Sequence, residues 1–427
     1  MKRYSLSSIF TEAFRDNLGW EKAWTKRQPK KEYQIIIVGG GGHGLATAYY
    51  LAKNFNITDI AVIEKGWIGG GNTGRNTTII RSNYLQESSI GIYEKSRFLY
   101  ETLSQDLNYN IMFSPRGVLM LCQTEHELRA MKRTSHANRI NGVDTKMVTP
   151  EEVKEIVPII NINGPRFPVL GALWQPRGGT ARHDAVAWGY ARKCSDFGID
   201  IIEQCEVIGV KKKREKIVGV ETTKGNIKAK KVCFVAAGHS SVLADLAGFR
   251  LPIESVALQA LVSEPIKPII DCVVMANTVH GYLSQSDKGE LVIGGGADGY
   301  NNYSQRGSFL HIEETVRALV ETFPVISRLR QLRQWGGIVD MTGDRSPIIS
   351  KTPVDGLYIN CGWGTGGFKA IPGSGWATAE MIYNEKPGKL ASPFSIDRFL
   401  EGRLIDESAA AAVAVSYTHL TLPTSRS

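Results

Sequence analysis

The chain has 427 residues, of which 42% are hydrophobic and 22% charged, and its 44 glycines cluster without a repeat period. This composition indicates a globular protein of about two to three domains and excludes disordered, collagen-like and coiled-coil proteins. The net charge is +9, but the basic clusters at 211–214 and 228–231 lack interleaved aromatic residues. We therefore interpret these clusters as solvated hairpin surface and expect no nucleic-acid partner.

The sequence shows no sign of membrane insertion or export. Its longest apolar runs are much shorter than the roughly 20 residues needed to cross a bilayer, and its first residues lack the apolar core of a signal peptide. We expect a cytoplasmic protein. The six cysteines lie far apart, with no C-x-x-C pair and no Cys/His metal spacing, so we expect buried, reduced thiols, no disulfide and no metal site.

The two ends of the chain differ in composition from the rest. Residues 1–31 are polar and basic, and they indicate an arm that lies on another surface, either of this fold or of a partner. Residues 415–427 have no hydrophobic periodicity. We expect this tail to be foreign to the native protein.

A strand, a glycine-rich turn and a helix follow one another from residue 33. Residues 33–38 form a short, largely apolar and β-branched run, which predicts a strand buried on both faces of a parallel sheet. The glycines of 39–44 come next, then 45–53 with the composition of a helix and 59–64 with that of another strand. Together they predict one complete βαβ unit.

The spacing Gly39-x-Gly41-x-x-Gly44 is informative because it sits between that strand and that helix. The first glycine permits a tight turn, the second lets a pyrophosphate approach the backbone, and the third allows close helix packing. Gly42 and the helix N-terminus are expected to donate N–H groups to the phosphates. Glu64, about 20 residues further on, is placed to bind a ribose. A plain strand-end carboxylate is the alternative for Glu64.

Two further strands run into glycine-rich turns, at 231–238 and at 356–360, the second being followed by the turn 362–367. Three such strands scattered over the chain indicate one sheet assembled around a long dinucleotide. This arrangement favours FAD, held along its whole length, over a nicotinamide cofactor, whose enzyme would need its catalytic apparatus after one such domain.

The predicted fold is α/β with two domains. A discontinuous, Rossmann-like FAD-binding domain with a parallel sheet is expected from 32–110, 178–250 and 337–405. A substrate domain with an antiparallel sheet is expected from 111–177 and 251–336, where 251–300 alternates apolar and polar residues. Helices are predicted at 184–198, near 312–332 and after residue 367.

Several of these segments resemble a known family, the β subunits of heterotetrameric sarcosine oxidases, within the D-amino-acid-oxidase-like flavoproteins. The resemblance runs from about residue 30 to about 414. Its most specific motifs are GGGGHGLATAYYLAKN (39–54), RNTTIIRSNY (75–84), QPRGGTARHD (175–184) and NCGWGTGGFK (360–369).

This resemblance implies oxidative demethylation of sarcosine to glycine, with formaldehyde or methylenetetrahydrofolate and hydrogen peroxide as further products. It implies non-covalent FAD at the sarcosine site and FMN attached covalently to His183, from which O2 takes the electrons. It also implies partner α, γ and δ subunits, with NAD and tetrahydrofolate as ligands expected on those partners. A surface histidine that precedes a helix is the alternative for His183.

Candidate site residues follow from the resemblance and from their place beside glycine-rich turns. Arg81 and Lys369 match the positions that hold the substrate carboxylate in related amine oxidases, and a cation suits an anion in a desolvated pocket. His280 and Tyr282 are expected either to face the methylamino group or to pack as a strand pair. Arg75 and Arg182 are candidates for the FMN phosphate. The remaining cofactor-binding candidates are Gly71, Asn72, Thr77, Thr78, Ile79, Val207, Gly364 and Gly367.

One departure from the family of monomeric relatives bears on oxygen. Those relatives carry a lysine above the flavin, and the corresponding stretch 294–298 has none. This fits reaction of O2 at FMN and leaves open a dehydrogenase with another acceptor. Two alternatives therefore stay open: an oxidase or dehydrogenase of dimethylglycine or another secondary amine, and a flavin-bearing electron-transfer or scaffold subunit whose amine site is inert.

Overall fold

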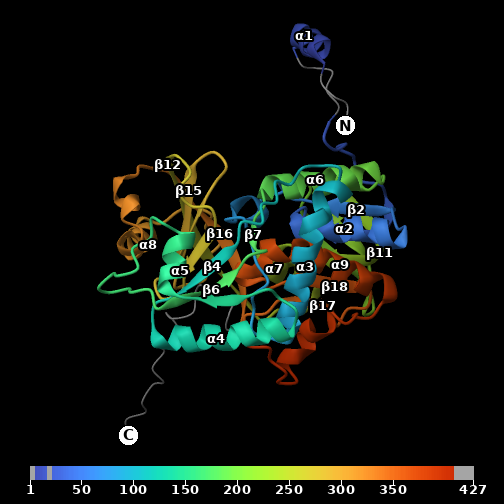
Figure 1. Ribbon diagram of the computed structural model, residues 1–427. Coiled ribbons are helices and arrows are strands. Elements are labelled where there is room, and N and C mark those ends of the chain that lie inside the picture. Colours follow the sequence, from blue (N-terminus) through green and yellow to red (C-terminus); the bar gives the residue numbers. More distant parts are fainter. Residues whose placement is uncertain (1–4, 17–21, 408–427) are drawn as a thin grey trace.

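The computed structural model describes residues 5–16 and 22–407. The tail expected at 415–427 lies outside the described residues. A mainly parallel sheet forms the centre of one half of the molecule (Figure 1). In order of pairing its strands are β17 (Ile348–Lys351), β18 (Leu357–Cys361), β11 (Gly225–Phe234), β1 (Glu32–Val38), β2 (Ile60–Ile63) and β8 (Asp200–Ile202), and β10 (Lys216–Thr222) and β9 (Val207–Lys213) extend from β11.

Strands β18, β11, β1, β2 and β8 run parallel to one another. Their carboxyl ends therefore meet at one edge of the sheet, where ligands of open α/β sheets bind. The three strands predicted to run into glycine-rich turns, β1, β11 and β18, are direct neighbours. This juxtaposition agrees with the prediction of one sheet built from distant segments.

Strand β1 is buried on both faces from Ile35 to Val38, as its largely apolar sequence predicts. Ile35 and Ile37 pack with one set of helices, and Ile36 and Val38 pack on the opposite side with α7 (Ser240–Ala247) and the β9–β11 region. The helices of the first set are α2 (Gly42–Phe55), α3 (Glu87–Asp106), α6 (His183–Asp196) and α9 (Gly367–Asn384).

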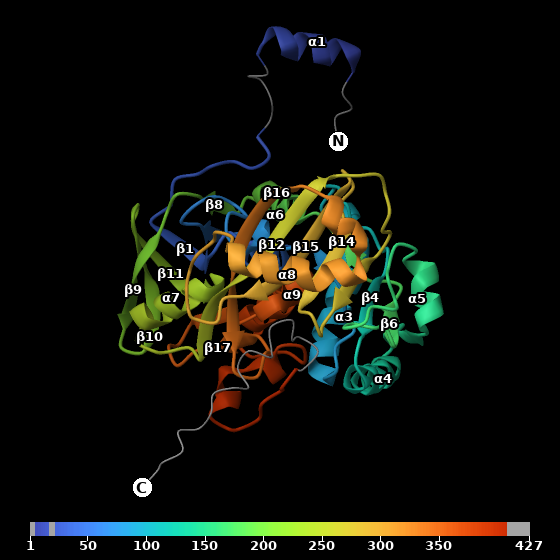
Figure 2. The same cartoon turned by 90° about the vertical axis from the view of Figure 1, so that its left-hand side faces the viewer.

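A second sheet occupies the other half of the molecule (Figure 2). Its strands in order are β16 (Gln331–Thr342), β12 (Ile253–Pro265), β15 (Glu290–Ala297), β14 (Gly281–Gln285), β13 (Val273–Ala276), β4 (Val118–Cys122), β6 (Gly171–Gln175) and β5 (Lys146–Val148). All neighbouring pairs are antiparallel except β13 and β4. The helices of this half are α4 (Glu125–Ile140), α5 (Pro150–Ile156) and α8 (Phe309–Thr322).

A two-stranded ribbon of β3 (Ile79–Ile80) and β7 (Gly179–Thr180) completes the sheets. The strands of the two large sheets come from different chain segments, and only β16 crosses the predicted boundary between 336 and 337. The division into a FAD-binding and a substrate domain at those residues stays a prediction.

The helix predicted near 312–332 is wrong at its C-terminal end. Helix α8 ends at Thr322, a 3-10 turn covers Pro324–Arg328, and Gln331 begins β16. Proline disfavours the helical conformation in the residue before it, which here is Phe323. The first three residues of β16 are exposed because this strand forms the sheet edge, and two of them are polar, so they give no sign of a buried strand face.

The N-terminal arm divides into two parts. Trp24 donates a hydrogen bond to Glu203 at 3.4 Å, and Arg27 and Lys30 form ion pairs with Asp200 at 3.1 and 3.4 Å. This part of the arm lies on the fold itself. Helix α1 (Leu6–Phe14) stands apart from the body (Figure 1) and buries none of its residues.

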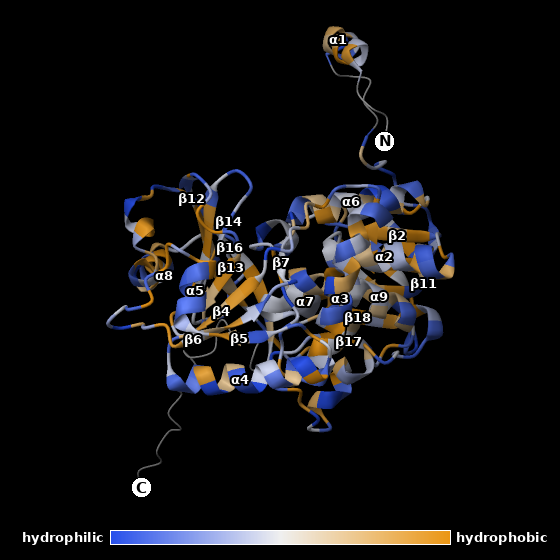
Figure 3. Ribbon diagram, viewed as in Figure 1, coloured by the Kyte–Doolittle hydropathy of each residue, from blue (hydrophilic) through white to orange (hydrophobic). Residues whose placement is uncertain are grey.

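Helix α1 carries hydrophobic and hydrophilic residues on different sides (Figure 3). Leu6, Ile9, Phe10 and Phe14 recur at helical spacing, and each is at least half exposed. In the part of the chain that the structure describes, no helix is long and apolar enough to cross a membrane. All six cysteines are buried as free thiols.

Candidate active site

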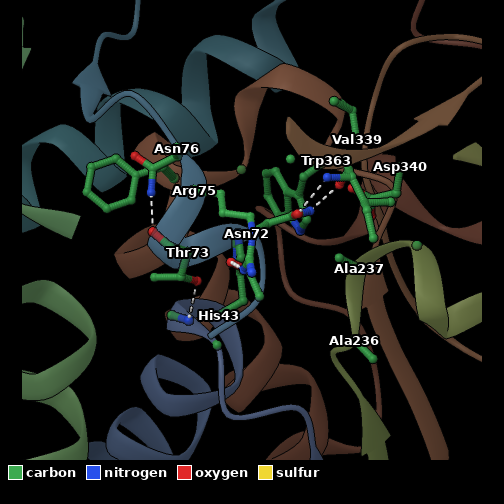
Figure 4. A pocket seen from close by; sticks show the side chains of 18 of the residues that line it. His43, Asn72, Thr73, Arg75, Asn76, Ala236, Ala237, Val339, Asp340 and Trp363 are labelled. Carbon is green, nitrogen blue, oxygen red and sulfur yellow. Dashed lines mark hydrogen bonds between the residues drawn. The ribbon is translucent and has the colours of Figure 1, made fainter. Parts of the chain in front are cut away.

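A cavity of about 540 Å³ lies where the carboxyl ends of the parallel strands face the second sheet. The first sheet contributes the residues that follow β1, β2, β11 and β18, and the second contributes parts of β12, β13, β14 and β16. Figure 4 shows the side chains on its walls. The predicted site residues that line the cavity are Gly39, Gly41, Gly42, Glu64, Gly71, Asn72, Arg75, Thr77, Thr78, Ile79, Arg81, Val207, Tyr282, Gly364, Gly367 and Lys369.

The glycine turn between β1 and α2 exposes bare backbone to the cavity. Gly39 has φ +122°, and a Cβ there would lie 2.2 Å from the carbonyl oxygen of Val235. Gly44 does not line the cavity, but a Cβ on it would lie 2.0 Å from the carbonyl oxygen of Gly39. Helix α2 begins directly after the turn, and its N-cap Gly41 makes no side-chain capping bond. The helix N-terminus therefore presents N–H groups and partial positive charge to an anion.

Glu64 follows β2 and stands in the cavity wall. Its carboxylate accepts hydrogen bonds from the N–H groups of Gly40 and Gly66, both at 2.8 Å. These bonds tie the carboxylate to the glycine turn and fix its direction. The remaining lone pairs of its two oxygens can accept hydrogen bonds from a hydroxylated ligand.

The loop from 70 to 79 crosses the cavity between the two halves. Asn72 accepts a hydrogen bond at 2.9 Å from the N–H of Ile338 in β16, and Arg75 donates to the carbonyl of Gly71 at 3.0 Å. Thr78 has φ +69°, which is rare and strained for a β-branched residue. Strain of this kind persists only where the surroundings hold the backbone, and here it shapes the wall of the cavity.

Arg81 and Lys369 bring two cations to the same cavity. Arg81 is 3% exposed and Lys369 is 7% exposed, although both are usually surface residues. Lys369 lies in the first turn of α9 and donates to the carbonyl of Thr365 at 2.9 Å. Burial, and after it the positive charge of Arg81, hold the pKa of Lys369 well below its usual range. An anion bound between them would offset this charge repulsion.

Tyr282 lines the cavity from β14, and burial raises the pKa of its hydroxyl. Its ring lies over Gly294, where a Cβ would be 2.0 Å from the tyrosine oxygen. Gly294, which belongs to the stretch 294–298 that has no lysine, thus provides the space for this ring. His280 does not belong to the strand: it lies in the preceding turn with φ +50° and is not among the lining residues.

Sequence reasoning missed three lining residues around the last glycine turn. His43 stacks on Trp363 with ring centroids 4.8 Å apart and hydrogen-bonds the Ser374 hydroxyl. Burial lowers the pKa of His43 to about 3, so the ring is neutral. Asp340 accepts from the N–H of Gly362 at 2.5 Å, and burial raises its pKa to about 6. His43 and Trp363 lie within recognised glycine motifs, whereas no local pattern marks Asp340.

His183 lies outside the lining residues, at the first position of α6. Its Nδ1 atom is buried and makes no hydrogen bond, and burial lowers the pKa of the imidazole. The neighbouring Arg182 is exposed and binds Asp184 at 2.9 Å. The structure thus holds a neutral imidazole nitrogen at this position.

Comparison with known proteins identifies the family. The family model for FAD dependent oxidoreductases matches residues 34–381. A sarcosine oxidase subunit beta of Rhodobacter capsulatus is 68% identical over 414 residues, which cover 97% of this chain and 100% of that protein. The chain belongs to the sarcosine oxidase β subunits, within the FAD-dependent oxidoreductases. A sarcosine oxidase subunit beta of Arthrobacter is 58% identical over 92% of this chain and 98% of that protein.

The fold of this FAD-dependent oxidoreductase also has a solved counterpart. An L-proline dehydrogenase from P. horikoshii is 30% identical and superimposes with a TM-score of 0.83, covering 88% of this chain and 100% of that one. FAD is the cofactor of the family. The site fits it, because the glycine backbone and the N-terminus of α2 suit a pyrophosphate and Glu64 suits a ribose hydroxyl.

Proposed function

We propose that this β subunit oxidises sarcosine to glycine at FAD held in the cavity, with Arg81 and Lys369 binding the substrate carboxylate. The observation that carries the proposal is the buried pair of cations beside the glycine turns. Relatives named as sarcosine oxidase subunit beta, similar over nearly the whole chain, support the same substrate.

FAD, when bound, supplies the acceptor for a hydride equivalent from the N-methyl carbon. The protein supplies position and charge. Arg81 offers a planar guanidinium and Lys369 an ammonium to the carboxylate, so the amine end of sarcosine is directed away from them. Tyr282 fills the wall on the second sheet, and backbone N–H groups of the turn at 364–367 suit a developing negative charge.

This assignment predicts a specific pH dependence. Lys369 must be protonated to attract a carboxylate, and its pKa is lowered by burial and by Arg81. The affinity for acetate, which has no amine of its own, is therefore expected to fall as the pH rises through the pKa of Lys369. In Arg81→Gln the repulsive charge is gone, so the fall is expected at higher pH. Titration of the flavin spectrum with acetate measures both curves, and coincident curves would contradict the assignment.

Turnover of N-methyl amino acids separates sarcosine from its competitors. The complex expressed with its partner subunits is expected to have a higher kcat/KM for sarcosine than for dimethylglycine. A preference for dimethylglycine would favour the related amine oxidase or dehydrogenase, and bound flavin that no amine reduces would favour an inert electron-transfer or scaffold subunit.

We further propose that His183 carries covalent FMN, which passes electrons to O2. A buried, neutral Nδ1 without a hydrogen-bond partner supports this, since an unprotonated imidazole nitrogen is a nucleophile toward a flavin methyl carbon. The attachment would replace a methyl C–H bond and the imidazole N–H bond with the N–C bond, and the two electrons would go to the flavin and from it to O2. Mass analysis of the acid-precipitated His183 peptide is expected to show an adduct of FMN mass. His183→Ala should lose this adduct and keep FAD, and an unmodified wild-type peptide would refute the attachment.

The subunit name of its relatives indicates a multi-subunit enzyme, and we propose that helix α1 docks on a partner subunit. Its apolar residues are uncovered, and the helix contains no Lys or Arg of the kind that enriches membrane-surface helices. Phe10→Asp with Phe14→Asp is expected to reduce co-purification of partners while the chain keeps its FAD. Undiminished assembly would refute this role. Thr11→Asp, on the polar side, serves as control.

A further inference from the structure

A fully buried ion pair between Arg398 and Asp344 connects the segment after α9 to the turn between β16 and β17. Arg398 Nε and Nη2 donate to the two carboxylate oxygens of Asp344 at 2.8 and 2.9 Å, and neither side chain is exposed. Arg398 also donates to the carbonyl of Ser346 at 2.8 Å. Burial acts to raise the pKa of Asp344, but the bonds and charge of Arg398 hold it below its usual range. The pair therefore stays ionised and fixes the path of the segment.

The same aspartate holds the chain further along. The N–H of Ile405 donates to the Asp344 carboxylate at 3.1 Å, and the N–H of Glu407 donates to the Asp344 carbonyl at 3.2 Å. The backbone of residues 405–407 is thus hydrogen-bonded to Asp344, the residue that also pairs with Arg398.

Glu407 reaches the start of a helix that is distant in the sequence. Its side chain is buried, and its two oxygens accept hydrogen bonds from the N–H groups of Leu85 at 3.2 Å and Gln86 at 3.0 Å. Gln86 is the N-cap of α3 and makes no capping bond with its own side chain. Glu407 thus holds the backbone N–H groups at and just before the N-cap, and its negative charge suits the positive end of the helix.

The backbone that Glu407 holds continues directly into the residues that orient Arg81. Arg81 Nη1 donates to Asn83 Oδ1 at 2.9 Å, and its guanidinium lies 4.3 Å from the centroid of the Tyr84 ring. The Tyr84 ring stacks on Tyr93 at 3.9 Å. Leu85 follows Tyr84 immediately, so Asn83 and Tyr84 lie on a short loop whose far end is held by Glu407.

The geometry points to Glu407 as a positioning residue for sarcosine binding, acting through the loop 82–86 on Arg81. This inference rests on the proposed function, in which Arg81 binds the carboxylate. Without Glu407 the loop loses two charge-assisted hydrogen bonds. Arg81 then spends less time in the orientation that meets the carboxylate, while the FAD-binding turns keep their own contacts.

The test compares Glu407→Ala and Glu407→Gln in the complete enzyme with its partner subunits. Glu407→Ala is expected to raise KM for sarcosine about tenfold, with kcat within about threefold of wild type and FAD content unchanged. Glu407→Gln, which keeps one acceptor oxygen, is expected to have a smaller effect. The dissociation constant of acetate, read from the flavin spectrum, is expected to rise in parallel with KM.

Glu401→Gln is the matched control, because Glu401 lies on the same segment and its side chain forms an exposed ion pair with Arg403. Its KM is expected to equal that of wild type. A purely structural role for Glu407 would lower FAD content or Tm and leave KM of the remaining holoenzyme unchanged, and that result would overturn the inference. A wild-type enzyme that does not oxidise sarcosine would instead refute the proposed function.

Discussion

Replacing Arg81 with alanine is expected to raise KM for sarcosine roughly 30-fold or more, with FAD content unchanged. Truncating one partner of a buried charge pair typically costs about 2 kcal/mol or more, which corresponds to such a factor. Arg81 is buried in the cavity wall, so water does not replace its bonds to the carboxylate. Steady-state kinetics on the purified complex, with flavin content as the reference, measures the change.

Arg177→Ala is the control for this substitution. Arg177 is a half-exposed arginine that pairs with Glu101 at 2.8 Å, and surface pairs of this kind contribute little. Its KM is expected to stay close to that of wild type. If Arg81→Ala and Arg177→Ala behaved alike, Arg81 would not bind the carboxylate.

Replacing Gly44 with alanine is expected to remove most of the bound FAD. The added Cβ would lie 2.0 Å from the carbonyl oxygen of Gly39, a backbone atom that cannot move without opening the turn between β1 and α2. About 1.4 kcal/mol of strain is enough to weaken binding tenfold. The flavin-to-protein absorbance ratio after purification measures the loss.

Gly299→Ala is the matched control, since nothing lies within 4 Å of a Cβ at that position. This variant is expected to keep its FAD. A Gly44→Ala protein as yellow as wild type would show that the glycine turn does not hold the cofactor.

The sequence predicts the parallel sheet well because its signals are local. A largely apolar run such as 33–38 predicts a buried strand, and the glycines after it predict a tight turn, without knowledge of the rest of the fold. Three such strands indicate that their ends meet at one edge of a sheet. The start of strand β16 is not predicted, because its exposure depends on an edge position that only the finished sheet defines.

The site residues also fall into those that a local motif marks and those that only contacts in the folded chain reveal. Arg81 and Lys369 are marked by the motifs around them, and the structure places both in the cavity wall. Asp340 and Glu407 belong to no motif, and each becomes informative only through contacts with residues distant in the chain. His280 is expected with Tyr282 on a strand of the second sheet, whereas β14 begins only at Gly281.

Anaerobic mixing of the purified complex with sarcosine tests the central claim most directly. The claim is that a small zwitterion, anchored by Arg81 and Lys369, gives its electrons to FAD in this cavity. Sarcosine is expected to bleach the visible flavin absorbance of wild type at concentrations that leave Arg81→Ala oxidised. Flavin that stays oxidised with sarcosine, or bleaches equally in both proteins, would contradict the account.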